Sequence, residues 1–372
     1  MNSSESNQES QSLPKSLQRG SLILRLMVIG LVILGIAGLF AYTAGWLTPN
    51  VLTPTKIIDR FEQVNGEHPG FRRNHAKGVC ISGYFESNGG GTVLSKAVVF
   101  LPGRVPIIGR FALAVGQPYA ADAAHTVRSM ALLFKLPDGE EWRTGMNNIP
   151  VFAVNSAQGF YDLLLASAPD PATGKPDPAK MSAFLAGHPE SAKAIQLIRI
   201  QPVSSGFTDS SYNSLDAFRF INAKGTVLPV RWSMVPVQPF QPLNPAMPRE
   251  SDTNQLFDAL IADIHSHALQ WHLIITVGQP DDPTADATLP WPPDRQRVDV
   301  GTLTIDHVES EDTSPARDIN FDPLVLPAGI TGSDDPLLSA RSVAYAQSFT
   351  RRESERKSPS AVSPAETTKL PP

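Results

Sequence analysis

The feature that most limits how this chain can fold is an uncharged apolar run near its N-terminus, residues 26–47. As a helix, these residues would span ~33 Å, because each residue adds ~1.5 Å. The hydrocarbon core of a bilayer is about 30 Å thick. Tyr42 and Trp46 lie at the far end of the run, where amphipathic rings favour the membrane–water interface. We therefore predict one transmembrane helix, a signal anchor over residues 22–47.

Positive charges at Lys15, Arg19 and Arg25 come before the uncharged run. They favour a cytoplasmic N-terminus and export of the remaining chain. Residues 1–21 are polar and are predicted to form a disordered cytoplasmic tail. We expect a single pass through the inner (cytoplasmic) membrane, with the main domain in the periplasm. A cleaved signal peptide is the alternative, although its apolar core usually has only about 7–15 residues.

The composition of the chain is that of a folded domain with many loops. Among 372 residues, 34 are proline and 41% are apolar, which favours a real core and few long helices. The net charge of −5 gives no indication of nucleic-acid binding. Cys80 is the only cysteine, so an intrachain disulfide and a cysteine-based zinc site are excluded.

Short alternating segments separated by turns dominate the chain after residue 75. They predict an antiparallel barrel or sandwich. The expected strands lie near residues 78–86, 107–113, 126–136, 217–221, 227–235, 269–277 and 298–305. Helices are expected at 53–65, 156–166, 178–197, 254–267 and 336–351. Residues 353–372 are rich in Ser, Pro, Glu and Lys and are predicted to be disordered.

A basic segment with one histidine, residues 72–78, precedes the first alternating strand. Its residues are Arg-Arg-Asn-His-Ala-Lys-Gly, and the strand that follows carries Cys80, Ser82, Tyr84 and Glu86 on one side. We predict a strand whose start carries His75, a side chain suited to acid–base chemistry. Taken alone, a single histidine in this place is more often an ordinary hydrogen-bonded residue.

The spelling Arg-x-x-His-Ala-Lys-Gly, followed by Gly-Tyr-Phe-Glu, resembles the distal haem segment of the catalase family. In that family the histidine stands over the haem iron and moves the peroxide proton. The resemblance covers residues 52–350, and it implies a haem-binding domain with haem b and a catalytic role for His75. It implies an α+β fold: an antiparallel β-barrel of the catalase type with surrounding helices, here preceded by the transmembrane helix. The chain is most similar to the small catalase-related peroxidases, because it is too short for the flavodoxin-like addition of the largest catalases.

Residues 335–345 resemble the proximal helix of the same family, in which Arg-x-x-x-Tyr supplies the iron ligand. Helical spacing places Arg341 one turn from Tyr345. A free phenol has a pKa of about 10, and a neighbouring guanidinium and ferric iron both favour the phenolate. The resemblance makes Tyr345 the iron ligand and Arg341 its partner. Without the resemblance, Arg341 and Tyr345 would be interpreted as an arginine stacked on a tyrosine at the surface of a C-terminal helix.

Four further residues match the family. Residues 147–152 resemble Asn-Asn-x-Pro-x-Phe, which implies that Asn147 orients the peroxide, with Asn148 as the alternative if the register is misplaced. A neutral amide can donate to developing charge without competing for the proton. Phe160 matches the ring that stacks on the haem. Arg72 and Arg110 match arginines near the propionates, for which a planar guanidinium is suited.

Two residues depart from the family pattern. The family usually has a serine after Arg110-Phe111 that holds the distal histidine, and this chain has Ala112. We therefore expect His75 to lack an orienting partner. Large catalases carry valine where this chain has Asn74. Both departures argue against efficient dismutation of hydrogen peroxide.

These features predict a haem-dependent peroxidase that reduces organic hydroperoxides. Its electrons would come from an external donor, either a small molecule or a protein, with weak or no dismutation of hydrogen peroxide. Two alternatives stay open: an isomerase or lyase of fatty-acid hydroperoxides, favoured by Asn74, and a non-catalytic haem-binding protein, favoured by Ala112.

Overall fold

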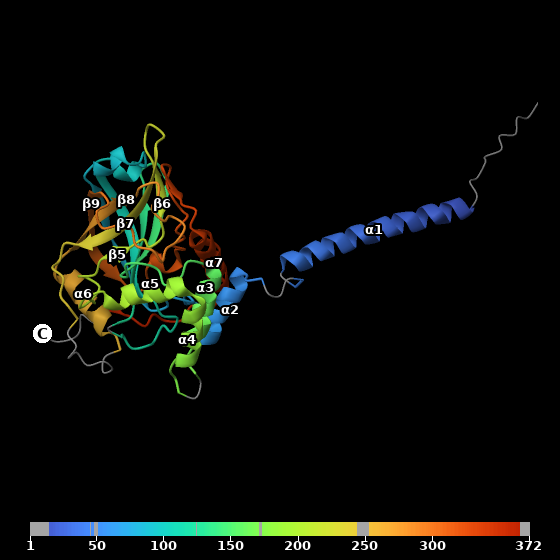
Figure 1. Cartoon of the computed structure of the whole chain (residues 1–372), viewed down its shortest axis with the longest axis horizontal. Coiled ribbons are helices and arrows are strands. Elements are labelled where there is room, and N and C mark those ends of the chain that lie inside the picture. Colours follow the sequence, from blue (N-terminus) through green and yellow to red (C-terminus); the bar gives the residue numbers. More distant parts are fainter. Residues whose placement is uncertain are drawn as a thin grey trace, which may run out of the picture. The chain divides into compact units, whose positions relative to one another are not determined.

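The computed structural model describes residues 15–44, 46–47, 51–123, 125–170, 173–243 and 253–364. The chain divides into two compact units, Met1–Thr53 and Pro54–Pro372 (Figure 1). In the first unit, helix α1 spans Lys15–Thr43, and its part Leu22–Thr43 is long and apolar enough to cross a membrane. This part fits a membrane anchor and a signal sequence equally well. Residues 15–21 are helical, so the predicted disordered tail is wrong there, and residues 1–14 lie outside the described residues.

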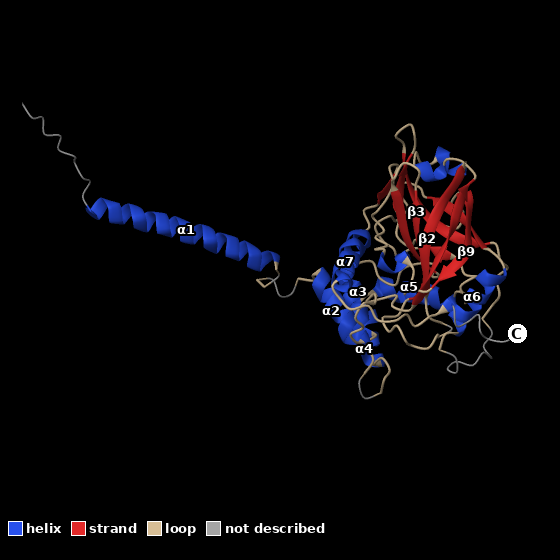
Figure 2. Cartoon of the chain, turned by 180° about the vertical axis from the view of Figure 1, so that it is seen from behind, coloured by secondary structure: helices blue, strands red, loops and turns tan. Residues whose placement is uncertain are grey.

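The second unit is built around an antiparallel β-barrel (Figure 2). Among the described residues, eight strands close it in the order β7-β5-β4-β3-β2-β1-β9-β8, because β7 also pairs with β8. These strands are β1 Gly78–Ser87, β2 Gly103–Leu113, β3 Arg128–Lys135, β4 Glu141–Asn147, β5 Tyr212–Asn213, β7 Val227–Pro236, β8 Leu269–Val277 and β9 Arg297–Glu309. Two short strands, β6 Phe218–Ile221 and β10 Ile330–Gly332, continue the sheet beyond β7. The predicted α+β barrel with an N-terminal apolar helix is confirmed.

Large aromatic side chains fill the barrel. Trp142, Trp232 and Trp271 are at most 1% exposed. Trp142 stacks on Phe134 with 4.8 Å between ring centroids. Alternate residues of a strand point to opposite faces, so each strand supplies every second side chain to this core. Strand β4, which is absent from the sequence prediction, follows the same rule, since it buries Trp142, Thr144 and Met146 on one face.

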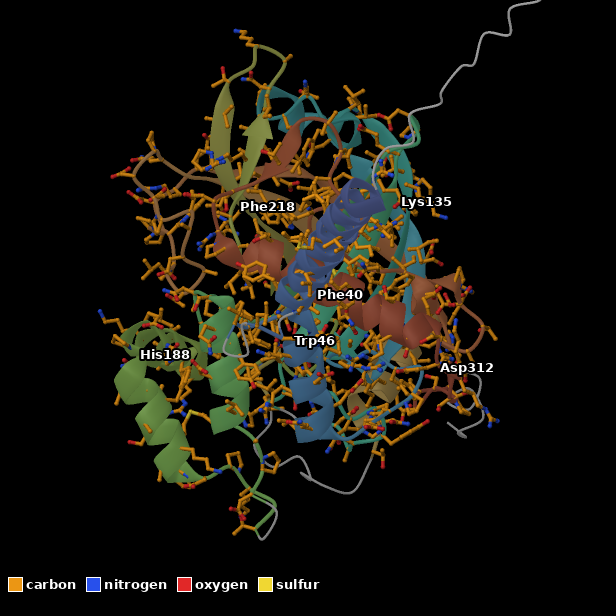
Figure 3. All side chains as sticks on the ribbon, turned by 90° about the vertical axis from the view of Figure 1, so that its right-hand side faces the viewer. Phe40, Trp46, Lys135, His188, Phe218 and Asp312 are labelled. Atoms are coloured by element: carbon orange, nitrogen blue, oxygen red, sulfur yellow. The ribbon has the colours of Figure 1, made fainter. Side chains whose placement is uncertain are left out.

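Helices lie outside the barrel, and α2, α3, α4 and α7 gather on one side of it (Figure 2). The helices of this unit are α2 Pro54–Asn65, α3 Ala157–Ala166, α4 Pro178–Gly187, α5 Pro189–Ile200, α6 Gln255–Ser266 and α7 Pro336–Glu353. Short 3-10 turns occur at η1 Gly90–Val93, η2 Val98–Phe100 and η3 Pro315–Asp318. One long helix was predicted over 178–197. It is instead divided at His188, because Pro189 lacks an N–H and starts a new helix (Figure 3).

Two further predictions about local structure are wrong. His75 is not on a strand: β1 begins at Gly78, and His75 lies in the preceding loop with φ 56°. The end of the chain is ordered beyond residue 353, because α7 includes Glu353, Glu355 pairs with Arg73, and Val362 is buried. Residues 365–372 of the predicted disordered tail lie outside the described residues.

Candidate active site

Two rows of cross-strand neighbours lie on the outer face of β1–β4. The first row is Gly78, Ala112, Ser129 and Asn147, and the second is Cys80, Arg110, Ala131 and Gly145. The residues between the rows, Val79, Phe111, Met130 and Met146, are buried in the barrel core. Because side chains alternate along a strand, both rows face outward. Most of their side chains are small, and Cys80, Ala112 and Ser129 are buried.

His75 is held against the first row by its own backbone and by its ring. Arg110 donates from Nη1 to the carbonyl of His75 (2.7 Å) and from Nη2 to the carbonyl of Ala76 (3.1 Å). These bonds fix a non-glycine residue in the left-handed region, a strain that concentrates at functional sites. The ring is fixed separately, because its Nδ1 lies 3.0 Å from Ser129 Oγ.

The same serine joins the histidine to Asn147. Ser129 Oγ donates a hydrogen bond to Asn147 Oδ1. Asn148 is occupied elsewhere, since its Oδ1 accepts from the backbone N–H of Arg128 (2.8 Å). The structure thus brings His75 and Asn147 together, and it favours Asn147 over Asn148. The expectation that Ala112 deprives His75 of an orienting partner is wrong, because Ser129 takes that position from the next strand.

His75 is uncharged at neutral pH. Burial, together with the positive charges of Arg110, Arg341 and Arg72, lowers the pKa of His75 to about 3. A neutral imidazole has a free lone pair, so it can accept a proton from a bound acid.

A cluster of three arginines surrounds the carboxylate of Glu311. The arginines are Arg72, Arg110 and Arg352. Glu311 accepts from Arg110 Nε (2.5 Å) and from Arg72 Nη1 (3.3 Å). Arg352 is 3% exposed, and its Nε is buried without a partner among the described residues. Burial and the charge of Arg110 lower the pKa of Arg352 to about 10. Burial, Arg352 and Arg110 also lower the pKa of Arg72. The charges of Asp318 and Glu353 also act on Arg352. Despite these carboxylates, the pKa of Arg352 and that of Arg72 are lowered, so the cluster has the positive potential of an anion site.

Arg352 was not predicted as a site residue. A signal for it was present, since it follows Tyr345 by seven residues on α7. Seven residues are close to two helical turns, so Arg352 and Tyr345 lie on one face of the helix.

Tyr345 and Arg341 have the predicted arrangement on α7. Arg341 Nη2 lies 3.4 Å from the Tyr345 hydroxyl and 3.3 Å from the carbonyl of Gly145 in the second row. Arg341 Nη1 also donates to the buried carboxylate of Asp216. Burial opposes the charge of Arg341, but Asp216 and Tyr345 outweigh it and raise the pKa of Arg341. Arg341 thus places a cation next to the Tyr345 hydroxyl.

The outer face of β1–β4 therefore brings the predicted residues into one region. In the first row, Ser129 contacts both His75 and Asn147. In the second row, Arg110 belongs to the arginine cluster, and the carbonyl of Gly145 lies next to Arg341. A side chain at Gly145 would approach only the Arg341 guanidinium, at 3.7 Å. Phe160 on α3 stacks on Phe152 (6.0 Å between centroids), and its role beside a cofactor stays a prediction.

Comparisons with known proteins agree with this geometry. A family model described as catalase matches residues 40–358. A catalase-related peroxidase of Synechococcus elongatus is 38% identical over 318 residues, which cover 85% of this chain and 93% of that protein. The chain belongs to the catalase family. A catalase-related peroxidase of Mycolicibacterium paratuberculosis is 32% identical over 302 residues, covering 81% of this chain and 95% of the relative. As a member of this family, the chain is an oxidoreductase that acts on peroxide.

Solved catalases share the fold over most of the chain. A fungal catalase superposes with a TM-score of 0.69 at 20% identity, covering 81% of this chain and 63% of the catalase. A bacterial catalase gives a TM-score of 0.65 at 22% identity, covering 82% of this chain and 62% of the catalase. The chain thus keeps the catalase barrel and corresponds to less than two thirds of each of these larger proteins.

Proteins of the catalase family bind haem, and the residues of the site fit this group. Arg72, Arg110 and Arg352 gather three guanidinium groups in one place, which suits the carboxylates of haem propionates. The partnerless Nε of Arg352 leaves a buried donor available to one of them. Tyr345 with Arg341 has the chemistry of a tyrosinate ligand for haem iron.

Proposed function

We propose that the chain is a haem b-dependent peroxidase that reduces organic hydroperoxides with electrons from an external donor. The observation that carries the proposal is the hydrogen-bonded set of His75, Ser129 and Asn147. When bound, haem supplies the iron and the redox chemistry. The overall reaction converts ROOH, two electrons and two protons into ROH and water.

The residues of the chain supply the proton transfers. Neutral His75 accepts the hydroperoxide proton at Nε2 and returns it to the leaving oxygen, so that an alcohol or water departs. The Asn147 amide donates a hydrogen bond to the peroxide while charge develops on it. The Tyr345 phenolate would hold the iron, and Arg341 would stabilise its negative charge.

Two observations support a bulky organic peroxide and an external donor. The chain matches the small catalase-related peroxidases over nearly their whole length, but only 62–63% of the solved catalases. A shorter chain has less protein with which to cover the peroxide side of the site. In addition, the half-buried Asn74 places a polar residue beside His75. Both features favour access by larger peroxides over rapid dismutation of hydrogen peroxide.

The assay for this proposal follows peroxide loss, donor oxidation and oxygen release together. The full-length protein loaded with haem, in a mild detergent, receives cumene hydroperoxide or hydrogen peroxide with an oxidisable dye. We expect donor oxidation with the organic peroxide and little oxygen release from hydrogen peroxide. Fast oxygen release without donor oxidation would overturn the proposal. Rearranged lipid hydroperoxide formed without a donor would favour the isomerase or lyase alternative.

His75→Ala separates catalysis from simple haem binding. Since His75 moves the proton and does not hold the iron, we expect unchanged haem content and a loss of about 10²–10⁴-fold in turnover. The non-catalytic alternative requires equal turnover in both proteins. The observation that motivated it, the missing serine at Ala112, is offset by Ser129.

For the location, the proposal is a single-pass anchor in the inner membrane with the catalytic domain in the periplasm. Lys15 and Arg19 come before the apolar part of α1 and Arg25 lies near its start, and these positive charges support this orientation. Fractionation followed by N-terminal sequencing of the protein in the membrane and soluble fractions tests it, because a cleaved signal peptide would remove residue 1 and release the domain into the soluble fraction.

A further inference from the structure

We propose that Ser129 is the positioning residue of the distal site and sets both the tautomer of His75 and the orientation of the Asn147 amide. The family pattern places a serine for the histidine on β2, at the position of Ala112. In this chain the function has moved to the directly paired residue of β3. The inference rests on the proposed function, since it explains how His75 and Asn147 are prepared for the peroxide.

The register of the barrel makes such a move possible. Ala112 and Ser129 are direct partners across β2 and β3, and Ser129 and Asn147 are direct partners across β3 and β4. Side chains of direct partners point to the same face, with Cβ atoms about 4.5–5.5 Å apart. A hydroxyl at either position 112 or position 129 therefore lies within reach of the same loop.

The hydrogen bonds of Ser129 fix the proton positions in the set. A serine hydroxyl has one proton to donate and two lone pairs. Its proton goes to Asn147 Oδ1, so the contact of 3.0 Å with His75 Nδ1 requires that Nδ1 carry the proton. The other ring nitrogen, Nε2, is then the free base. With its oxygen bound by Ser129, the Asn147 amide directs its N–H groups away from the serine.

Burial strengthens this arrangement. Ser129 is 7% exposed, so water competes little for its hydroxyl. The pKa of His75 falls to about 3 because of burial and three arginines, which keeps the ring neutral and leaves the choice of tautomer to its partner. The charged groups that act on the His75 ring are Arg110, Arg341 and Arg72. A guanidinium has no acceptor, so none of them can accept the Nδ1 proton.

The chain offers a matched control. Ser233 on β7 donates to Asn213 Oδ1 (2.6 Å), a serine–asparagine pair in the continuation of the same row across β5 and β7. The two pairs have the same chemistry, but the structure gives Ser233 no contact with His75 among the described residues. Loss of a generic serine–asparagine bond is thus separable from loss of the contact with His75.

The experiment compares Ser129→Ala, Ser233→Ala and the double variant Ala112→Ser with Ser129→Ala. In steady-state assays with cumene hydroperoxide, we expect Ser129→Ala to lower kcat about 10–100-fold with little change in KM. Ser233→Ala should keep the wild-type kcat. The double variant should recover most of the loss, because the hydroxyl returns from the paired position. A wild-type kcat in Ser129→Ala, or an equal loss in Ser233→Ala, would overturn the proposal.

Two further readouts do not depend on peroxide turnover. The rate of cyanide binding to the ferric protein needs a base for the HCN proton, so it should fall in Ser129→Ala and recover in the double variant. In the haem-free full-length protein, ¹⁵N-histidine NMR should show His75 with the proton on Nδ1, and Ser129→Ala should lose this tautomer. If the wild type binds cyanide rapidly but does not reduce hydroperoxides, the proposed function fails while these readouts still decide the role of Ser129. An unchanged His75 tautomer in Ser129→Ala would refute that role.

Discussion

Between about pH 4 and pH 7, Asp335 should dominate the pH dependence of stability; it is the N-cap residue immediately before α7. Its Oδ1 accepts from the backbone N–H of Leu337 (2.9 Å), and its Oδ2 is buried without a partner among the described residues. Burial and the nearby charge of Asp216 raise the pKa of Asp335 from 3.8 to about 7. Between these two values the folded chain holds a proton that the unfolded chain has released. Stability is therefore lost as the pH rises from about 4 to 7.

The perturbation is Asp335→Asn, which keeps an oxygen for the N-cap but cannot ionise. A shift from 3.8 to about 7 corresponds to ~4 kcal/mol at ~1.36 kcal/mol per pH unit. Asp216 shares this effect, and nearby solvent screens it, so we expect about half of the limit. At pH 8 the variant should be more stable than the wild type by about 2 kcal/mol. At pH 4.5 the two proteins should be nearly equal, because Asp335 is then protonated.

The assay is urea unfolding of the full-length chain in a non-ionic detergent, followed by tryptophan fluorescence. Trp142, Trp232 and Trp271 are buried in the barrel and report its unfolding. His75 changes the stability in the opposite direction. Its pKa is lowered from 6.5 to about 3 in the folded chain, so its contribution to stability is lost as the pH falls through that range. The comparison of variant and wild type at each pH cancels this contribution.

Asp334→Asn is the control for the neighbouring exposed residue. Hydrogen bonding from Thr284 lowers the pKa of Asp334, with Arg219 acting in the same direction. Removal of its charge should therefore bring no gain in stability at pH 8. If Asp335→Asn gave the same difference from the wild type at pH 4.5 and pH 8, the reasoning about the buried carboxylate would be refuted.

Two predictions concern the cofactor. Tyr345→Phe removes the phenol, so the absorption spectrum of the haem-loaded protein should lose its tyrosinate character, and an unchanged spectrum would contradict iron ligation by Tyr345. Arg352→Gln removes one buried positive charge from the arginine cluster, which should lower haem affinity about tenfold. The measurement is the rate of haem transfer to apomyoglobin, which should be faster from the variant. Equal transfer rates in variant and wild type would exclude a contact between Arg352 and a propionate.

The strands and helices that the sequence predicts are those with regular apolar spacing. Strand β8 buries Trp271, Leu273 and Ile275 in strict alternation, and its predicted bounds are confirmed. Strand β4 was missed because its inner face carries the polar Thr144 between Trp142 and Met146, which interrupts the apolar alternation. The pattern within a segment thus predicts an element only where both faces are distinct.

The order of the C-terminal segment was beyond local patterns. Residues 353–372 are polar and proline-rich, which locally favours disorder. The carboxylate of Glu355 nevertheless pairs with the buried guanidinium of Arg73, a residue from the opposite end of the domain. Arg73 also binds Glu62 on α2 (2.7 Å between Nε and Oε1). A contact between residues so distant in sequence depends on the closed barrel that brings them together.

The surroundings of His75 were also beyond prediction from local sequence patterns. Comparison position by position identifies Ala112 as a lost serine and leads to the expectation of an unsupported histidine. The cross-strand register reverses this conclusion, because Ser129 is the direct partner of Ala112 and lies on the same face. In this barrel the hydroxyl that contacts His75 comes from β3, at the position paired with Ala112 of β2. Site residues on neighbouring strands should therefore be compared as rows across the sheet, in which a loss at one position is weighed against a gain at its partner.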